Sequence, residues 1–117
     1  MRGTVIRLRA SGFDTHLWFV VSNPDPETNR VLAFNLTDVK NYPSSRCILD
    51  VGEHPQITIR SAVRYFSPKI WDVETLQKLI KNDTFEQFQN ASEEVIQKII
   101  SGAYEDDTPD PCFKYLP

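Results

Sequence analysis

The chain lacks several features that mark large classes of proteins. Its 117 residues include only two cysteines, and no apolar run approaches the roughly 18 residues of a membrane span. Near the start, Arg7 and Arg9 interrupt the segment that a signal peptide would need to be apolar. Cys47 and Cys112 show no spacing typical of a zinc site, so two free thiols in a reducing compartment are expected. These absences predict a cytoplasmic protein.

The short motifs of cofactor-dependent catalysis are also absent. The sequence contains no GxxxxGK[ST] phosphate loop, no GxSxG nucleophile elbow, no dinucleotide-binding fingerprint and no cluster of metal ligands. It has neither internal repeats nor a low-complexity segment. We expect no cofactor and no metal, so the protein either uses its own side chains for chemistry or acts by binding.

The charge is unevenly distributed along the chain. Residues 1–70 carry nine Lys and Arg against six Asp and Glu, a balance of +3, whereas residues 71–117 carry four against ten, a balance of −6. The two balances give the net charge of −3. This asymmetry fits a polyanion-binding surface beside a solvated acidic face, but it also fits chance.

What the sequence does contain, in its first 70 residues, is a set of alternating and strongly apolar segments that predict strands. Proline-containing loops separate several of them. The predicted strands comprise residues 3–9, 16–22, 30–36, 47–51 and 56–65, with residues 68–71 available to close the sheet.

After the last strand the apolar period changes from two to 3.6, which predicts helices. Asp72 is a suitable N-cap for the first helix, and Ser92 for the second. Gly102 is expected to end the second helix as its C′ residue. Phe85 and Phe88 are expected in a short turn between the two helices.

These elements predict an α+β, mainly β fold: a small, curved antiparallel barrel of five to six strands followed by two C-terminal helices that cover one side. We expect one domain over residues 1–117. Its parts are a β-barrel at 3–71, a helical extension at 72–102, and an acidic, Pro-rich tail at 103–117. Such tails are usually loose, although the aromatic residues of this one could dock on the body.

Polar residues at strand ends are the main candidates for chemistry. His16 opens one apolar strand, Thr37 ends the next, and His54 lies in a turn. If the two strand ends meet, a histidine and a hydroxyl lie together, and two histidines can share the roles of base and acid in phosphodiester transfer. Each histidine has an acidic neighbour in sequence that can orient its ring, Asp14 and Glu53 respectively. The bland alternatives are structural histidines and a turn threonine bonded to local backbone.

A second set of candidates lies on the predicted hairpin at residues 56–65. Arg60 and Arg64 share one face by alternation, whereas Ser61 and Tyr65 share the other. Such positions suit the binding of RNA, and they equally suit any solvated strand.

The order of these parts resembles the MazF/PemK (CcdB-like) growth-inhibitor family of toxin–antitoxin systems. The resemblance covers about residues 3–70 and is carried by the apolar strand HLWFVVS, which begins at His16, and by the next apolar strand, which ends at Thr37. It implies an SH3-like barrel and cleavage of single-stranded RNA without a metal. In the family an Arg-Pro pair precedes the first apolar strand, and here His16 and Leu17 stand in its place. Thr37 falls on the family's catalytic threonine or serine.

The resemblance implies attack of a ribose 2′-hydroxyl on its own phosphate, which leaves a cyclic phosphate. His16 and His54 would serve as base and acid, while Thr37 and Arg60 or Arg64 would hold the developing charge. The expected partners are single-stranded RNA, a cognate antitoxin and a second copy of the chain in a homodimer. The alternative function is a non-catalytic barrel of the same shape that binds proteins.

Overall fold

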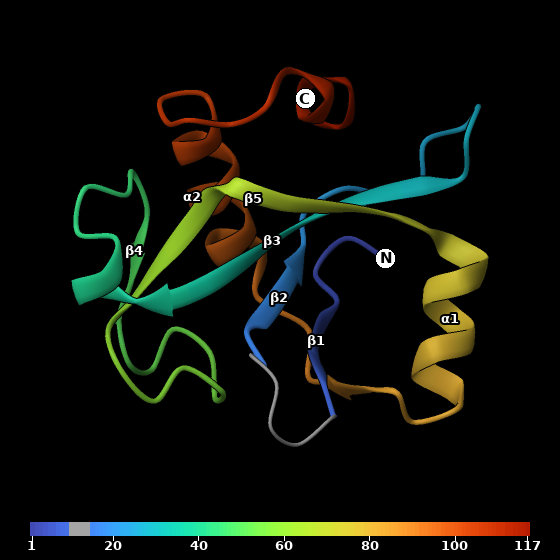
Figure 1. Cartoon of the computed structure of the whole chain (residues 1–117), viewed down its shortest axis with the longest axis horizontal. Coiled ribbons are helices and arrows are strands. Elements are labelled where there is room, and N and C mark those ends of the chain that lie inside the picture. Colours follow the sequence, from blue (N-terminus) through green and yellow to red (C-terminus); the bar gives the residue numbers. More distant parts are fainter. Residues whose placement is uncertain (10–14) are drawn as a thin grey trace.

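The computed structural model describes residues 1–9 and 15–117 and has a mainly β, α+β fold (Figure 1). Six antiparallel strands curl into a half-barrel in the order β4-β5-β3-β2-β1-β6, and two α-helices lie near the C-terminus. This confirms the predicted fold class. The strands are β1 (Val5–Leu8), β2 (Leu17–Val20), β3 (Arg30–Asp38), β4 (Ile48–Leu49), β5 (Ser61–Asp72) and β6 (Phe85–Phe88). The helices are α1 (Val73–Lys81) and α2 (Glu93–Ala103), with 3-10 helices η1 (Val39–Asn41) and η2 (Asp110–Tyr115).

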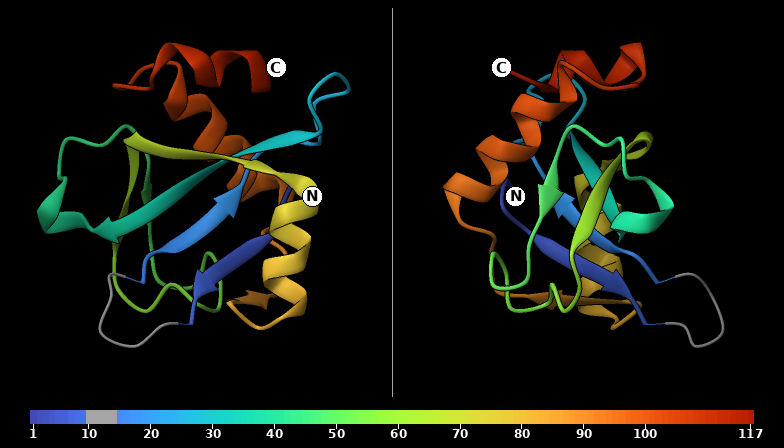
Figure 2. Two further views of the ribbon diagram at one scale, coloured as in Figure 1. Left: turned by 45° about the vertical axis from the view of Figure 1, so that its right-hand side comes forward. Right: turned by 90° about the vertical axis from the view of Figure 1, so that its left-hand side faces the viewer.

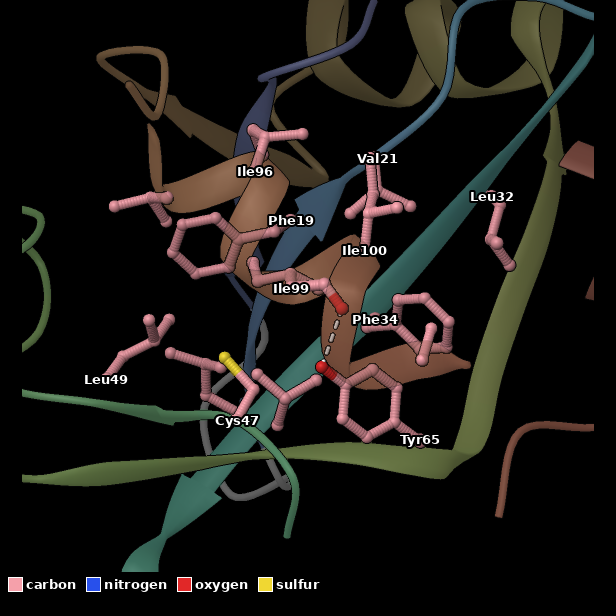
Figure 3. Close-up of a cluster of buried hydrophobic side chains, with 14 of the residues drawn as sticks. Phe19, Val21, Leu32, Phe34, Cys47, Leu49, Tyr65, Ile96, Ile99 and Ile100 are labelled. Atoms are coloured by element: carbon pink, nitrogen blue, oxygen red, sulfur yellow. Dashed lines mark hydrogen bonds between the residues drawn. The ribbon is translucent and has the colours of Figure 1, made fainter. Parts of the chain in front are cut away.

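Both faces of the sheet are covered, each by a different helix. Successive strand residues point to opposite faces, so Val5 belongs to the apolar cluster under α2 and Ile6 to a separate cluster under α1. Figure 3 shows Ile96, Ile99 and Ile100 of α2 reaching the strand residues of the first cluster. The prediction that both helices cover one side is therefore wrong. Apolar residues on both faces of the strands need a cover on each.

The N-terminal caps of both helices form as predicted. The Asp72 carboxylate accepts a hydrogen bond from the Thr75 backbone N–H, and the Ser92 hydroxyl accepts one from Val95 N–H. The prediction for Gly102 is wrong, because this residue lies inside α2, which continues to Ala103. Its lack of a side chain has a packing reason: an added Cβ would lie 2.3 Å from the Tyr65 hydroxyl oxygen.

Strand β5 is longer than predicted because a bulge accommodates its proline. Ala33 pairs with Lys69 while Asn35 pairs with Arg64, so a single β3 residue opposes four β5 residues. Pro68 lies among these four, where its missing N–H breaks no regular ladder. The sequence predicted strand at 56–60, but that segment forms turns and loop, and the ladder begins only at Ser61.

The segment between the helices is strand β6 rather than the predicted turn. It pairs antiparallel with β1 at one edge of the sheet. Phe85 packs with the cluster under α1, whereas Phe88 packs with the cluster under α2. Residues three apart in a strand point to opposite faces, so both rings find apolar surroundings.

The tail docks on the body through a 3-10 helix. Cys112 and Leu116 are buried in the same cluster as α2, and Tyr115 packs against that cluster. Figure 2 shows η2 beside the C-terminal end of α2. The Thr108 hydroxyl donates a hydrogen bond to Ala103 O at 2.7 Å, which joins the tail to the last turn of α2. The aromatic and apolar residues at the end of the tail thus become part of the fold.

Candidate functional site

A polar hollow interrupts the outer face of the sheet, the face that carries Ile6 and Val20 and that α1 covers farther along. It has a volume of about 390 Å³. We call it the Arg64 hollow, and its lining residues are His16, Thr37, Asn41, Tyr42, Arg64 and Phe66. They come from the start of β2, the end of β3, the turn formed by η1, and β5. The sequence prediction that His16 and Thr37 meet at one rim is confirmed, because both line this hollow.

His16 and Arg64 are in direct contact in this hollow. Arg64 Nη1 lies 2.8 Å from His16 Nε2. A guanidinium has only donors, so His16 Nε2 must accept this hydrogen bond and carries a lone pair. The imidazole is then neutral, with its proton on Nδ1. An imidazole held in this way can take a proton at Nε2 once the guanidinium turns from it to a bound anion.

Asn35 and Phe66 hold the Arg64 side chain in place. Asn35 Oδ1 accepts a hydrogen bond from Arg64 Nη1 at 3.2 Å, and its Nδ2 donates to Ser67 O at 2.8 Å. The bond to Ser67 fixes which way the amide faces, so its oxygen points to the arginine. The guanidinium carbon also lies 5.2 Å from the centre of the Phe66 ring. The buried amide and the ring limit the rotamers of Arg64 and pre-organise its charge.

Thr37, near the end of β3, contributes a hydroxyl to the hollow. Its Oγ1 accepts a hydrogen bond from Asn41 Nδ2 at 3.2 Å. The Asp38 side chain accepts from Lys40 N–H and caps η1, which turns the chain so that Asn41 comes back over Thr37. Thr37 retains its own hydroxyl proton as a donor toward the hollow.

Tyr42 forms a wall of the hollow and is held from the C-terminal segment. Its hydroxyl donates to Asp106 Oδ1, and its ring meets the Phe66 ring edge to face at 5.2 Å. Burial, followed by this hydrogen bond and the negative charge of Asp106, raises the pKa of Tyr42 to about 12. Burial also raises the pKa of Asp106. Bonds from Tyr42 and from the N–H groups of Asp107 and Arg46 outweigh that effect and bring this pKa below its ordinary value.

His54 does not belong to the Arg64 hollow. Its side chain is only 3% exposed, and its ring packs edge to face on Phe19 at 5.7 Å. His54 Nε2 lies 2.8 Å from Gln89 O and therefore donates to it, while Nδ1 accepts from Gln56 N–H at 3.1 Å. Both ring nitrogens are thus used to join the loop before β5 to the segment before α2. Its expected partner Glu53 instead bonds Lys98. We therefore leave His54 out of the site.

Tyr65 and Ser61 face away from the Arg64 hollow, on the inner face of the sheet. Tyr65 is fully buried, and its hydroxyl donates to Ile99 O at 2.7 Å (Figure 3). Ser61 is buried and donates to Ile59 O at 2.8 Å, although it also lines an adjoining hollow. Arg60 is exposed and pairs with Asp50 at 3.0 Å, outside both hollows. Of the four predicted RNA-binding residues, Arg64 alone lines the Arg64 hollow.

Sequence reasoning missed four residues that shape the hollow. Asn35 gave a usable signal, because an amide inside the apolar run VLAFNL needs buried partners. Asn41 and Tyr42 gave no signal, since a turn of ordinary composition places them. Phe66 is 49% exposed and lies between the predicted strand at 56–65 and the segment at 68–71, so no role was predicted for it. Asp14, the expected neighbour of His16, lies outside the described residues.

No group of three or more His, Cys, Asp or Glu side chains in residues 1–9 and 15–117 is placed to hold a metal ion. None of the helices formed by these residues combines the length and apolar character that a membrane crossing needs. A comparison with models of known protein families, with curated proteins and with solved structures finds no match for the chain.

Proposed function

We propose that the Arg64 hollow binds the phosphodiester backbone of single-stranded RNA, and that the protein is a metal-independent endoribonuclease. The observation that carries this proposal is the hydrogen bond from Arg64 to His16 Nε2, with the Thr37 hydroxyl in the same hollow. These three groups supply a proton acceptor, a fixed positive charge and a neutral donor. Each of the three lowers the barrier to a transesterification at phosphorus.

The guanidinium of Arg64 is suited to hold the phosphate. Besides the Nη1 hydrogens directed at His16 and Asn35, it has N–H groups on Nε and Nη2 that match two phosphate oxygens. Its contact with Phe66 and its bond to Asn35 keep it oriented before the substrate arrives. A pre-organised cation stabilises the charge that develops on the non-bridging oxygens without reorganising during the reaction.

The proposed reaction proceeds in one displacement. When the phosphate binds, Arg64 Nη1 turns from His16 Nε2 to a phosphate oxygen and frees the Nε2 lone pair. His16 Nε2 then takes the proton of a ribose 2′-hydroxyl, and the 2′-oxygen forms a bond to the adjacent phosphorus. The bond from phosphorus to the 5′-oxygen breaks at the same time, and water supplies the proton that the 5′-oxygen needs. Thr37 donates to a non-bridging oxygen. The products are a 2′,3′-cyclic phosphate and a 5′-hydroxyl, and His16 then returns its proton to solvent.

The Phe66 ring supports the assignment to single strands. It is half exposed at the edge of the hollow, beside the arginine that would hold the phosphate. An exposed ring beside a bound backbone offers a stacking surface to an unpaired base, whereas bases in a duplex are stacked on each other.

The curled six-stranded sheet with helices near its C-terminal end also supports the resemblance to the MazF/PemK growth inhibitors. On this proposal the protein is a toxin-like component that acts in the cytoplasm, forms homodimers and has a cognate antitoxin. Expression of the chain alone in a bacterium should then arrest growth, and the His16→Ala variant should not.

Cleavage can be tested directly with purified protein, end-labelled single-stranded RNA and EDTA. We expect products that end in a 2′,3′-cyclic phosphate and a 5′-hydroxyl, and no cleavage of DNA of the same sequence. The His16→Ala variant should bind the RNA but fail to cut it. RNA that stays intact with the wild-type protein would contradict the catalytic assignment.

One observation favours a second candidate, a non-catalytic binding module. Because His54 is buried away from the hollow, no second histidine stands ready to protonate the leaving oxygen. In this second candidate the same hollow would bind a protein partner and would not catalyse a reaction. RNA would then remain both unbound and intact in the cleavage assay.

A further inference from the structure

A second hollow adjoins the Arg64 hollow at the end of the half-barrel. It has a volume of about 220 Å³ and shares His16 and Thr37 with the first. We call it the Arg7 hollow. Its other lining residues are Arg7, Thr15, Leu17, Leu36, Asp38, Gln56, Ile57, Thr58, Ile59 and Ser61. The two hollows therefore meet at the groups that the proposed function assigns to catalysis.

The inner part of the Arg7 hollow is apolar. Leu17 at the start of β2, Leu36 near the end of β3 and Ile57 in the loop before β5 line it, and all three are buried members of the cluster under α2. These side chains are fixed by the core behind them. A flat apolar ligand can cover them, whereas a phosphate would lose hydration there without gaining partners.

The rest of the lining of the Arg7 hollow is mostly polar and comes from three segments. Arg7 of β1 stands on one side, with its guanidinium 5.8 Å from the centre of the Phe88 ring. Gln56 and Thr58 of the loop before β5 also line it, together with Asp38 after Thr37. Donors and acceptors around an apolar floor match a nucleobase, which has apolar faces and a hydrogen-bonding edge.

One donor of the Arg7 side chain is buried. Its Nε is buried and has no hydrogen-bond partner among the described residues. A buried donor without an acceptor costs free energy in the unbound protein. The terminal N–H groups of the same guanidinium can donate to a base edge that offers ring nitrogen or carbonyl acceptors, as arginine does with guanine.

The size of the Arg7 hollow limits what it can hold. Pockets for drug-sized ligands have volumes of roughly 300–1,000 Å³, and this one is smaller, at about 220 Å³. It suits one planar base better than a whole nucleotide. The sugar and phosphate would remain outside, at the boundary formed by His16 and Thr37.

We infer that the Arg7 hollow is a base-specific subsite of the proposed ribonuclease. The inference rests on the proposed function and adds its substrate class: RNA in which one base beside the cleaved phosphodiester enters the Arg7 hollow. The base on the other side stacks on Phe66. The protein should accordingly discriminate among bases at one of the two positions flanking the cut, and far less at the other, because stacking tolerates any base.

The test uses single-stranded DNA oligonucleotides with one internal ribonucleotide, so that only one bond can be cut. The bases on the two sides of that bond are varied in all combinations. With the wild-type protein, we expect the cleavage rate to change about tenfold or more with the base at one flanking position. At the other position we expect a change below about threefold.

The Gln56→Tyr variant fills the Arg7 hollow and should remove the base preference. Its matched control is Gln77→Tyr on the exposed face of α1, which should keep the preference. If Gln56→Tyr unfolds, as judged by thermal melting, Thr58→Tyr from the exposed part of the same loop replaces it. Rates that are equal for all bases, or a preference that survives in the hollow-filling variant, would overturn the subsite while leaving the ribonuclease in place. A wild-type protein that cuts none of the substrates would overturn the proposed function and the subsite together.

Discussion

The contact between Gly102 and Tyr65 gives a prediction that tests the packing of α2 on the sheet. An added Cβ at position 102 would lie 2.3 Å from the Tyr65 hydroxyl oxygen, 3.0 Å from its Cζ and 3.1 Å from Arg46 O. Real Cβ atoms essentially never come as close as 2.3 Å to another atom, and the other two distances are tighter than most real Cβ contacts, so the Tyr65 ring or the backbone must shift. In an unpacked helix, the Gly102→Ala change would instead stabilise by about 1 kcal/mol.

The expected magnitude follows from three contributions. Overpacking costs about 1–3 kcal/mol, and displacing the ring weakens the Tyr65 bond to Ile99 O by about 1 kcal/mol. The gain in helix propensity offsets about 1 kcal/mol of this cost. We expect Gly102→Ala to lower the free energy of unfolding by about 1–3 kcal/mol. For a domain of this size, each kcal/mol corresponds to a fall of roughly 4 °C in the melting temperature.

A double-mutant cycle separates the clash from other effects. Tyr65→Phe removes the hydroxyl and should itself cost about 1 kcal/mol, because Ile99 O loses a buried donor. In that background, Gly102→Ala should cost at least about 1 kcal/mol less than in the wild type. Urea unfolding followed by circular dichroism measures all four proteins, with Ser101→Ala on the exposed side of α2 as control. A stabilised Gly102→Ala variant, or strictly additive effects, would refute this packing.

Three further predictions concern pH and the walls of the site. Burial raises the pKa of Cys47 to about 11. The stabilisation that comes from its neutral thiol is therefore complete below pH 9, and the free energy of unfolding should fall by about 3 kcal/mol as the pH rises through 11. Urea unfolding at several pH values should show a flatter fall in Cys47→Ala. Burial raises the pKa of Asp106, but its hydrogen bonds, first that from Tyr42, outweigh burial and lower this pKa. The stabilisation from the charged carboxylate is therefore present above pH 3.8 and lost in acid, so the free energy of unfolding should fall as the pH is lowered, and should fall less in Asp106→Asn. Phe66→Ala should weaken binding of single-stranded RNA by about 1–3 kcal/mol in a fluorescence titration, whereas Phe113→Ala, also exposed, should not.

The strands and helix starts could be predicted because their signals are local. The apolar runs before Ser22 and before Thr37, and the caps at Asp72 and Ser92, each depend on a few neighbouring residues. The curl of the sheet follows from many short antiparallel strands. The role of Gly102 could not be predicted, because the Tyr65 ring that requires a glycine is 37 positions away.

The site was predicted only in part, for a similar reason. His16 and Thr37 could be predicted together because the start of one strand lies beside the end of the next strand in an antiparallel pair. His54 was placed in the site by residue type alone, and its burial depends on contacts with Phe19 and Gln89 from distant segments. The sequence pattern could not distinguish Arg64 from the other basic residues of the predicted hairpin, because only its hydrogen bond to His16 sets it apart.

The most direct test of the account compares two arginines near the same end of the sheet. Arg64 contacts His16 in the hollow, while Arg60 is exposed and pairs with Asp50. Cleavage of single-stranded RNA, measured as the rate at saturating protein, should fall by about 10²–10³-fold in Arg64→Ala because the developing charge loses its fixed cation. It should change less than about threefold in Arg60→Ala, which removes the same charge from the protein. Equal losses in the two variants, or full activity in Arg64→Ala, would contradict the assignment of the hollow as the catalytic centre.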